Sequence, residues 1–324
     1  MIVDLPDTTT SAISKALVKI REEGGAVALG RVLTLVIATR SGAEEEAIEA
    51  ANDASREHPM RVIVVSTTAD AEDAGAPSRL DAEIRVGGDA GASEVIVLRA
   101  CGAAAGDEES LVMGLLLPDA PVVTWWPGQA PDRPGESPLG RIAQRRITDA
   151  SAQVDPQAAL RVLAANYSPG DADFAWTRLT LWRAQLAAVL DQPPYESVTD
   201  VEVTGSIDSP STTLLAAWLR MQLGAETQYR LTPVEEGSHG IRGVVLDRPS
   251  GAIELVRDLP GVATLRQPGQ PTHDLALPRR NLRDCLADEL RRLDPDELYG
   301  EVITVGLAEL IGVESAPAPQ EALR

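Results

Sequence analysis

The sequence predicts an α/β protein: a mostly parallel sheet with helices on both faces, followed by a C-terminal α+β domain with a mainly antiparallel sheet. The first part is indicated by strands that are apolar on consecutive residues, as in strands buried on both faces, and by the helices that separate them. The second part is indicated by several short strands and tight turns after residue 226.

The N-terminal elements follow one another in the order expected of a parallel sheet. Residues 8–11 carry four hydroxyl groups that can cap a first helix, which ends at Gly24-Gly25. We expect the runs 33–38, 62–66, 95–98 and 122–125 to be neighbours in the sheet, joined by right-handed crossovers. The predicted elements are strands at 32–37, 61–65, 83–86, 94–98 and 121–126, and helices at 44–57 and 107–117.

The remaining elements predict a second domain. Helices are expected at 155–166, 171–190, 212–223, 282–293 and 296–310, and strands at 198–203, 227–231, 243–246, 253–256 and 263–265. Ser168-Pro169-Gly170 separates the first two helices and marks a domain boundary. We therefore predict an α/β domain at 1–168, an α+β domain at 169–312 and a disordered tail, rich in Pro and Ala, at 313–324.

Composition excludes several classes of function. The chain has 49 Asp and Glu against 29 Lys and Arg, a formal net charge of −20. Such a charge repels phosphate backbones and anionic lipid, so we expect neither nucleic-acid nor membrane binding. The N-terminus does not resemble a signal peptide, and no apolar run is long enough to span a membrane. Cys101 and Cys285 lie far apart in sequence, so we predict two reduced, unlinked thiols in a cytoplasmic protein.

Catalytic and metal motifs are absent from the sequence. The three histidines, His58, His239 and His273, stand alone, and no Cys or His pairs have the spacing of a zinc site. The glycine-rich run 87–93 precedes a strand instead of linking a strand to a helix, so it is interpreted as a turn. We therefore assign no catalytic, cofactor-binding or metal-binding residue and expect no cofactor.

Tryptophan and arginine residues are the best candidates for contact with a partner. Trp125 and Trp126 end a predicted strand at the sheet edge where ligands and partners usually bind, and a proline-rich loop at 127–138 follows them. Each has an alternative interpretation: the tryptophans can pack under helices, and the arginines can pair within the chain. Trp and Arg are enriched at binding hot spots. The candidate partner-binding residues are Trp125, Trp126, Arg141, Arg145, Arg146, Trp176 and Arg178.

A second basic set lies near the C-terminus. Its arginines alternate with carboxylates, which indicates an ordinary charged helix face. The set comprises Arg279, Arg280, Arg283, Arg291 and Arg292.

Six motifs, in order along roughly residues 1–310, resemble the OpcA family of glucose-6-phosphate dehydrogenase assembly proteins, and the Arg- and Ala-rich composition suits an actinobacterial member. The motifs are RVLTL (31–35), HPMRVI (58–63), RACG (99–102), VVTWWPG (122–128), AQRRITD (143–149) and DFAWTRL (173–179).

The resemblance implies a non-enzymatic effector that binds glucose-6-phosphate dehydrogenase, favours its active oligomer and raises its activity, and so supports NADPH supply through the pentose phosphate pathway. Cyanobacterial relatives are associated with thioredoxin-linked control, and this chain has Met60 where they often have Cys.

Two other classes of function stay open at this point. In the first, the α/β domain is a small-molecule sensor that binds a sugar phosphate or nucleotide, an anionic metabolite, at the strand ends near Trp125 and Arg145. In the second, the chain is an enzyme without a recognisable motif.

Overall fold

The computed structural model describes residues 1–23, 31–67, 77–87, 94–234 and 239–314. Contacts divide the chain into two units, each assembled from separate segments. The first unit comprises Met1–Gln153, Ser168–Phe174 and Asn281–Pro295, and the second comprises Val154–Tyr167, Ala175–Arg280 and Asp296–Arg324.

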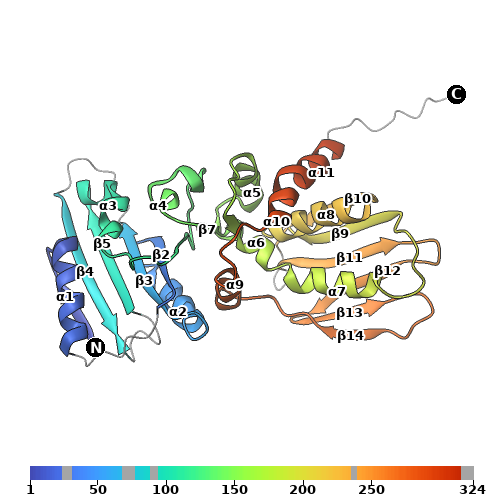
Figure 1. The fold of residues 1–324 in the computed structure, drawn as a ribbon. Coiled ribbons are helices and arrows are strands. Elements are labelled where there is room, and N and C mark those ends of the chain that lie inside the picture. The colour runs from blue at the N-terminus through green and yellow to red at the C-terminus, as the bar shows by residue number, and fades with distance from the viewer. Residues whose placement is uncertain (24–30, 68–76, 88–93, 235–238, 315–324) are drawn as a thin grey trace. The chain divides into compact units, whose positions relative to one another are not determined.

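The first unit is built on an eight-stranded sheet in the order β1-β4-β5-β3-β2-β6-β7-β8 (Figure 1). The strands from β5 to β8 in this order pair in parallel, whereas β4 is antiparallel to both β1 and β5. The expected neighbours β5, β3, β2 and β6 are therefore confirmed. The strands are β1 Ile2–Leu5, β2 Leu33–Arg40, β3 Met60–Thr67, β4 Arg79–Val86, β5 Glu94–Cys101, β6 Val122–Trp125, β7 Arg145–Thr148 and β8 Asp171–Asp173.

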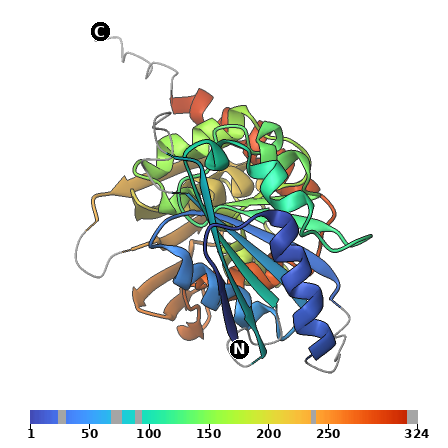
Figure 2. The same cartoon turned by 90° about the vertical axis from the view of Figure 1, so that its left-hand side faces the viewer.

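Helices cover both faces of this sheet. One face carries α1 (Thr10–Glu23), α3 (Glu108–Met113) and α4 (Pro138–Arg141), and their apolar side chains pack with those of the strands in one core cluster. Figure 2 shows α1, in dark blue, lying along the strands. The other face carries α2 (Glu44–Ala54) and α9 (Leu282–Glu289) in a second cluster. Short 3-10 helices lie at Gly102–Gly106, Pro134–Glu136 and Ala150–Ala152.

Helix α9 joins the first unit although it follows all the strands of the second. Its Cys285 and Leu286 pack in the core cluster with α2. Arg283 lies 2.7 Å from the carboxylate of Asp53 on α2. The boundary at 168/169 stays a prediction, and by contacts the segment 281–295 groups with the first sheet.

The predicted helix at 171–190 is wrong at its start. Asp171–Asp173 form β8, and two helices follow, α6 (Phe174–Thr177) and α7 (Thr180–Leu190). Long-range polar contacts hold β8 in the sheet, because Asp173 accepts a hydrogen bond of 2.6 Å from Thr148 on β7. Its carboxylate also accepts from the amide of Ala150 at 2.9 Å. These contacts override the local helical pattern.

The second unit contains a six-stranded sheet in the order β10-β9-β11-β12-β13-β14. Only the β10–β9 pair is parallel, so the sheet is mainly antiparallel, as expected. The strands are β9 Asp200–Ser206, β10 Glu226–Thr232, β11 Ile241–Asp247, β12 Ile253–Leu259, β13 Val262–Arg266 and β14 His273–Ala276.

The helices of the second unit include a break that the sequence did not predict. The expected helix at 296–310 consists of α10 (Glu297–Glu301), a π-helical turn at Val302–Gly306, and α11 (Leu307–Glu314). Gly306 packs against α8, where an added Cβ would lie 2.4 Å from the sulfur of Met221. The other helices are α5 Pro156–Ala165 and α8 Pro210–Leu223.

The structure also bears on the expectations for the cysteines, for membrane-spanning segments, and for the glycine-rich run and the tail. Cys101 and Cys285 are both free of disulfides, and Cys285 is buried. Among the described residues, no helix is both long and apolar enough to cross a membrane. Most of the glycine-rich run 87–93 and of the tail 313–324 falls outside the described residues.

The buried carboxylate of Glu94, the first residue of β5, forms ion pairs with three arginines. Glu94 is 1% exposed, and its oxygens lie 3.0 Å from Arg21, 2.8 Å from Arg31 and 2.9 Å from Arg61. Arg21 lies on α1 and Arg61 on β3, so the cluster joins a helix to two strands. Removing one member of a buried ion pair leaves an unpaired charge, which is strongly destabilising.

We predict that Glu94→Gln lowers the free energy of unfolding by about 3 kcal/mol, because three guanidinium groups lose their shared anion. Urea unfolding monitored by circular dichroism measures the change. Glu57→Gln is the matched control, since Glu57 forms an exposed ion pair with Arg291 in the same unit. Equal unfolding midpoints for the two variants would show that the Glu94 cluster contributes no more than a surface pair.

Candidate functional site

The seven candidate partner-binding residues fall into both units. The first unit holds Trp125, Trp126, Arg141, Arg145 and Arg146, and the second holds Trp176 and Arg178.

The adjacent tryptophans point to opposite faces of the first sheet. Trp125, at the end of β6, is fully buried and packs 5.6 Å from Phe174 in the cluster that α2 and α9 cover. Trp126 is 5% exposed and packs in the cluster that α1, α3 and α4 cover. Both indoles therefore fill the two cores of the first unit, which is the packing alternative that the sequence left open.

Arg145 on β7 is buried and fully engaged within the first unit. Its Nε donates to a carboxylate oxygen of Glu289 on α9 at 2.8 Å, and its Nη2 donates to the same oxygen. Its Nη1 donates to the carbonyl oxygen of Asp294 at 2.8 Å. This guanidinium therefore joins the sheet to α9 and its following turn.

Arg146 is buried and engaged in the same way, on the other side of the strand. It donates to Asp171 and to the carbonyl of Pro169, both at 2.5 Å, and to the carbonyl of Ala143 at 3.2 Å. These bonds hold β8 and the turn before it against β7. The pairing of Arg145 and Arg146 within the chain is thus the alternative that the geometry favours.

Arg141 is the exposed arginine of the set in the first unit. It lies at the end of α4, 3.0 Å from the carboxylate of Glu109, and donates to the carbonyl of Glu136 at 2.9 Å. The loop that precedes α4 presents a second exposed ion pair, Arg133–Glu136, at 3.1 Å. Charged side chains therefore gather on this loop and on α4.

Trp176 of the second unit is held by specific contacts. Its Nε1 donates to Asp296 at 2.9 Å, and the guanidinium of Arg183 lies 3.9 Å from the ring centre. The ring of Tyr299 lies 5.8 Å away. Because the indole is 2% exposed, it serves the packing of α6 and α7 with α10.

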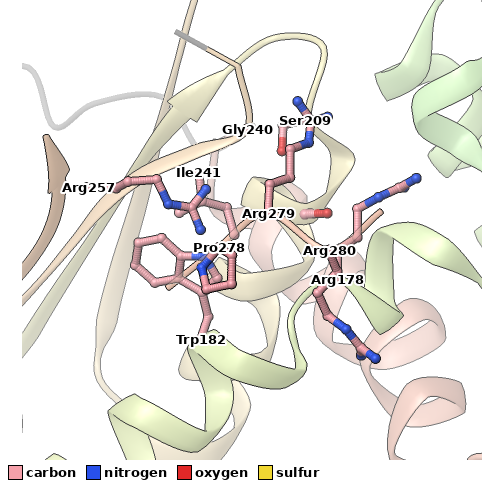
Figure 3. Close-up of a pocket in the computed structure, with 10 residues that line it drawn as sticks. Arg178, Trp182, Ser209, Gly240, Ile241, Arg257, Pro278, Arg279 and Arg280 are labelled. Atoms are coloured by element: carbon pink, nitrogen blue, oxygen red, sulfur yellow. The ribbon is translucent and has the colours of Figure 1, made fainter. Parts of the chain in front are cut away.

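Arg178, the last candidate, lines a pocket within the second unit. Three more arginines line it, and no carboxylate does so (Figure 3). The pocket lies beside the start of α8, which provides two serines. Its lining residues are Arg178, Trp182, Ser209, Ser211, Gly240, Ile241, Arg257, Pro278, Arg279 and Arg280. We name this set the arginine pocket.

Arg257 has the least favourable surroundings in the arginine pocket. Its guanidinium lies 5.1 Å from the ring centre of Trp182, and its buried Nε has no hydrogen-bond partner among the described residues. Burial, together with repulsion from Arg279, lowers the pKa of Arg257. The charged form of this side chain is therefore less stable here than in water.

A larger cavity of about 720 Å³ adjoins the arginine pocket and shares part of its wall. Arg257 and Arg279 line both spaces. Polar side chains from several strands and turns line the larger one, including Ser206, Thr232 and His239. Volumes of this size hold small molecules.

Sequence reasoning missed most of this pocket. Arg279 and Arg280 were expected on a charged helix face, but they precede Asn281, the N-cap of α9, so they are not on the helix. Arg257 lies on β12 without any local motif. Only the topology brings these residues together, so no spacing in the sequence could have revealed them. Among the described residues, no group of acidic, His or Cys side chains could hold a metal ion.

Two models of known protein families match the chain. One is described as the N-terminal domain of a glucose-6-phosphate dehydrogenase subunit and matches residues 51–165. The other is described as the C-terminal domain of the same kind of subunit and matches residues 169–303. No individual curated protein matches significantly.

Solved structures show weaker likeness. An oxidoreductase from Sinorhizobium meliloti has a TM-score of 0.42 and 11% identity, covering 88% of this chain and 90% of that one. An oxidoreductase from Pseudomonas syringae has the same TM-score and identity, covering 88% and 96%. These values are too low to support an inference about function.

The two family models match in order and together span more than half of the chain. They agree with the motifs that resemble the OpcA family. The chain belongs to this family of glucose-6-phosphate dehydrogenase subunit proteins.

Proposed function

We propose that this chain is a non-catalytic assembly factor and allosteric activator that binds glucose-6-phosphate dehydrogenase in the cytoplasm and favours its active oligomer. The observation that carries the proposal is the match of both halves of the chain to models named for a subunit of that enzyme. The absence of catalytic motifs from the sequence agrees with it.

Activation requires a difference in affinity. A protein that binds the active and inactive forms of the dehydrogenase equally well does not change the equilibrium between them. This chain therefore has to bind the active oligomer more tightly than the inactive form. A preference of roughly 100-fold corresponds to about 2.7 kcal/mol. A standard interface of about 1,600 Å² can supply such a difference from a few well-placed contacts.

The exposed charges on the first unit are our proposed contact surface. Arg141, Arg133 and Glu136 lie on one loop and helix, and side-chain and backbone bonds hold them in place. Trp126 and Arg146, which flank this loop and helix in the sequence, are buried. In this proposal the buried members of the candidate set position the surface, and Arg141 touches the partner.

The sensor alternative at the strand ends near Trp125 and Arg145 has no support of this kind. The guanidinium of Arg145 is already bound by Glu289 and by the carbonyl of Asp294. Trp125 is fully buried, so neither side chain is available to an anionic metabolite at that place.

We predict that the purified full-length chain co-elutes with glucose-6-phosphate dehydrogenase from the same organism, shifts it to a larger oligomer and raises its activity. Size-exclusion chromatography with light scattering and an NADPH absorbance assay measure the two effects. The chain alone should reduce no NADP in the same assay. Failure to co-elute, together with unchanged dehydrogenase activity, would exclude an assembly role, and turnover by the chain alone would exclude a non-catalytic one.

The buried and exposed arginines should behave differently. We predict that Arg141→Ala weakens dehydrogenase activation about tenfold or more without lowering the melting temperature, because truncating an interface anchor typically costs about 2 kcal/mol. Arg145→Ala should instead reduce the free energy of unfolding by about 3–5 kcal/mol, since it leaves Glu289 buried and unpaired.

Arg266→Ala is the matched control for Arg141→Ala, because Arg266 also forms an exposed ion pair, with Glu254, but in the second unit. Activation should be unchanged in this variant. If Arg141→Ala activates like the wild type, the dehydrogenase contacts another surface.

A further inference from the structure

The arginine pocket concentrates positive charge in a chain whose net charge is −20. Its lining includes four arginines and no carboxylate. We propose that Arg257 and Arg279 bind the phosphate group of a small phosphorylated molecule where the arginine pocket, of about 20 Å³, opens into the larger cavity that both arginines also line. The proposal does not depend on the function proposed above, because it concerns the second unit alone.

Many arginines of the described chain form an ion pair with a nearby carboxylate, as Arg145 does with Glu289. Arg257 and Arg279 form no ion pair with the described residues, although they lie close enough to repel each other. Arg257 is half-buried and Arg279 is exposed, so an anionic ligand would relieve the desolvation of Arg257 and its repulsion from Arg279.

Asp208 lies near the pair, and the charge of Arg279 contributes to lowering its pKa, but Asp208 lines neither the arginine pocket nor the larger cavity. Asp208 is held by Ser206 and by His239, whose Nδ1 lies 2.7 Å from its carboxylate. Asp258 lines the larger cavity but not the arginine pocket, and it is exposed. No carboxylate is therefore among the residues that line the arginine pocket.

The start of α8 adds hydrogen-bonding groups of the kind that phosphate needs. Ser209, the N-cap of this 14-residue helix, is 3% exposed and lines the pocket. Its hydroxyl does not cap the helix and has no hydrogen bond with the described residues. Two guanidinium groups, a free hydroxyl and a helix N-terminus suit a dianion with three acceptor oxygens better than a single carboxylate.

The adjoining cavity defines the rest of the ligand. Its volume of about 720 Å³ is enough for a sugar or a nucleoside, and Arg257 and Arg279 line both spaces. Ser206, Thr232 and His239 can form hydrogen bonds with hydroxyl groups there. Figure 3 shows Arg257 beside the indole of Trp182, whereas the side chain of Arg279 extends toward Ser209.

The test measures binding to the purified full-length chain without the dehydrogenase. At equal ionic strength, inorganic phosphate and glucose 6-phosphate should raise the melting temperature, whereas succinate and glucose should not. Isothermal titration calorimetry should give one site per chain. Tighter binding of glucose 6-phosphate than of inorganic phosphate would assign the larger cavity to a sugar, and the reverse order would assign the site to the free anion.

Two variants and one control locate the site. Arg279→Gln should weaken phosphate binding by about tenfold or more, and because Arg279 is exposed, the variant should fold normally. Arg257→Gln should weaken binding equally without lowering the melting temperature of the ligand-free chain, since it removes a poorly solvated cation. Arg230→Gln removes an equal charge on β10, outside both spaces, and should bind as the wild type does.

The proposal fails if inorganic phosphate and glucose 6-phosphate both leave the melting temperature unchanged, or if succinate stabilises the chain as strongly as phosphate. It also fails if Arg279→Gln binds like the wild type or if Arg230→Gln loses affinity to the same extent. Each of these results leaves the assembly role untouched, because dehydrogenase binding is measured separately.

Discussion

The buried ion pair between Arg145 and Glu289 is the constraint on which the rest of the first unit depends. The two residues are 144 positions apart, and the pair attaches α9 to β7. Once α9 is fixed, Cys285 and Leu286 cover the face of the sheet that α2 leaves open. A buried pair adds little net stability, but it fixes the position of α9 against β7, because a shift that breaks the pair leaves an unpaired charge in the core.

The sequence predicts the apolar strands of this fold but not the strands that depend on distant ion pairs. Long apolar runs such as those of β2 and β3 are recognisable without any tertiary information. Strands β7 and β8 are short and carry Arg145, Arg146 and Asp171, so their composition is typical of a surface loop. They are strands only because distant partners neutralise their charges, and no local window of sequence contains those partners.

The candidate residues also divide into those that the sequence singles out and those that only the fold brings together. The sequence identified Trp126 and Arg146 as unusual, and the structure explains them through the two cores and the ion pairs of the first unit. Of the seven candidates, Arg178 is the one that lines the arginine pocket. Arg257 and Arg279 come from a strand and a turn that only the antiparallel sheet brings together, so residue types and spacing could not single them out.

The late position of α9 also sets an order of events during synthesis. The ribosome releases every strand of both sheets before residues 281–295, so the face of the first sheet opposite α1 is covered by α2 but not by α9 while the second sheet is made. Domains generally fold as units as they emerge, and exposed apolar surface at that stage favours aggregation. In this chain the N-terminal unit is completed only after every strand of the second sheet has been made, and a nascent chain that stops before α9 lacks both part of that core and the Glu289 partner of Arg145.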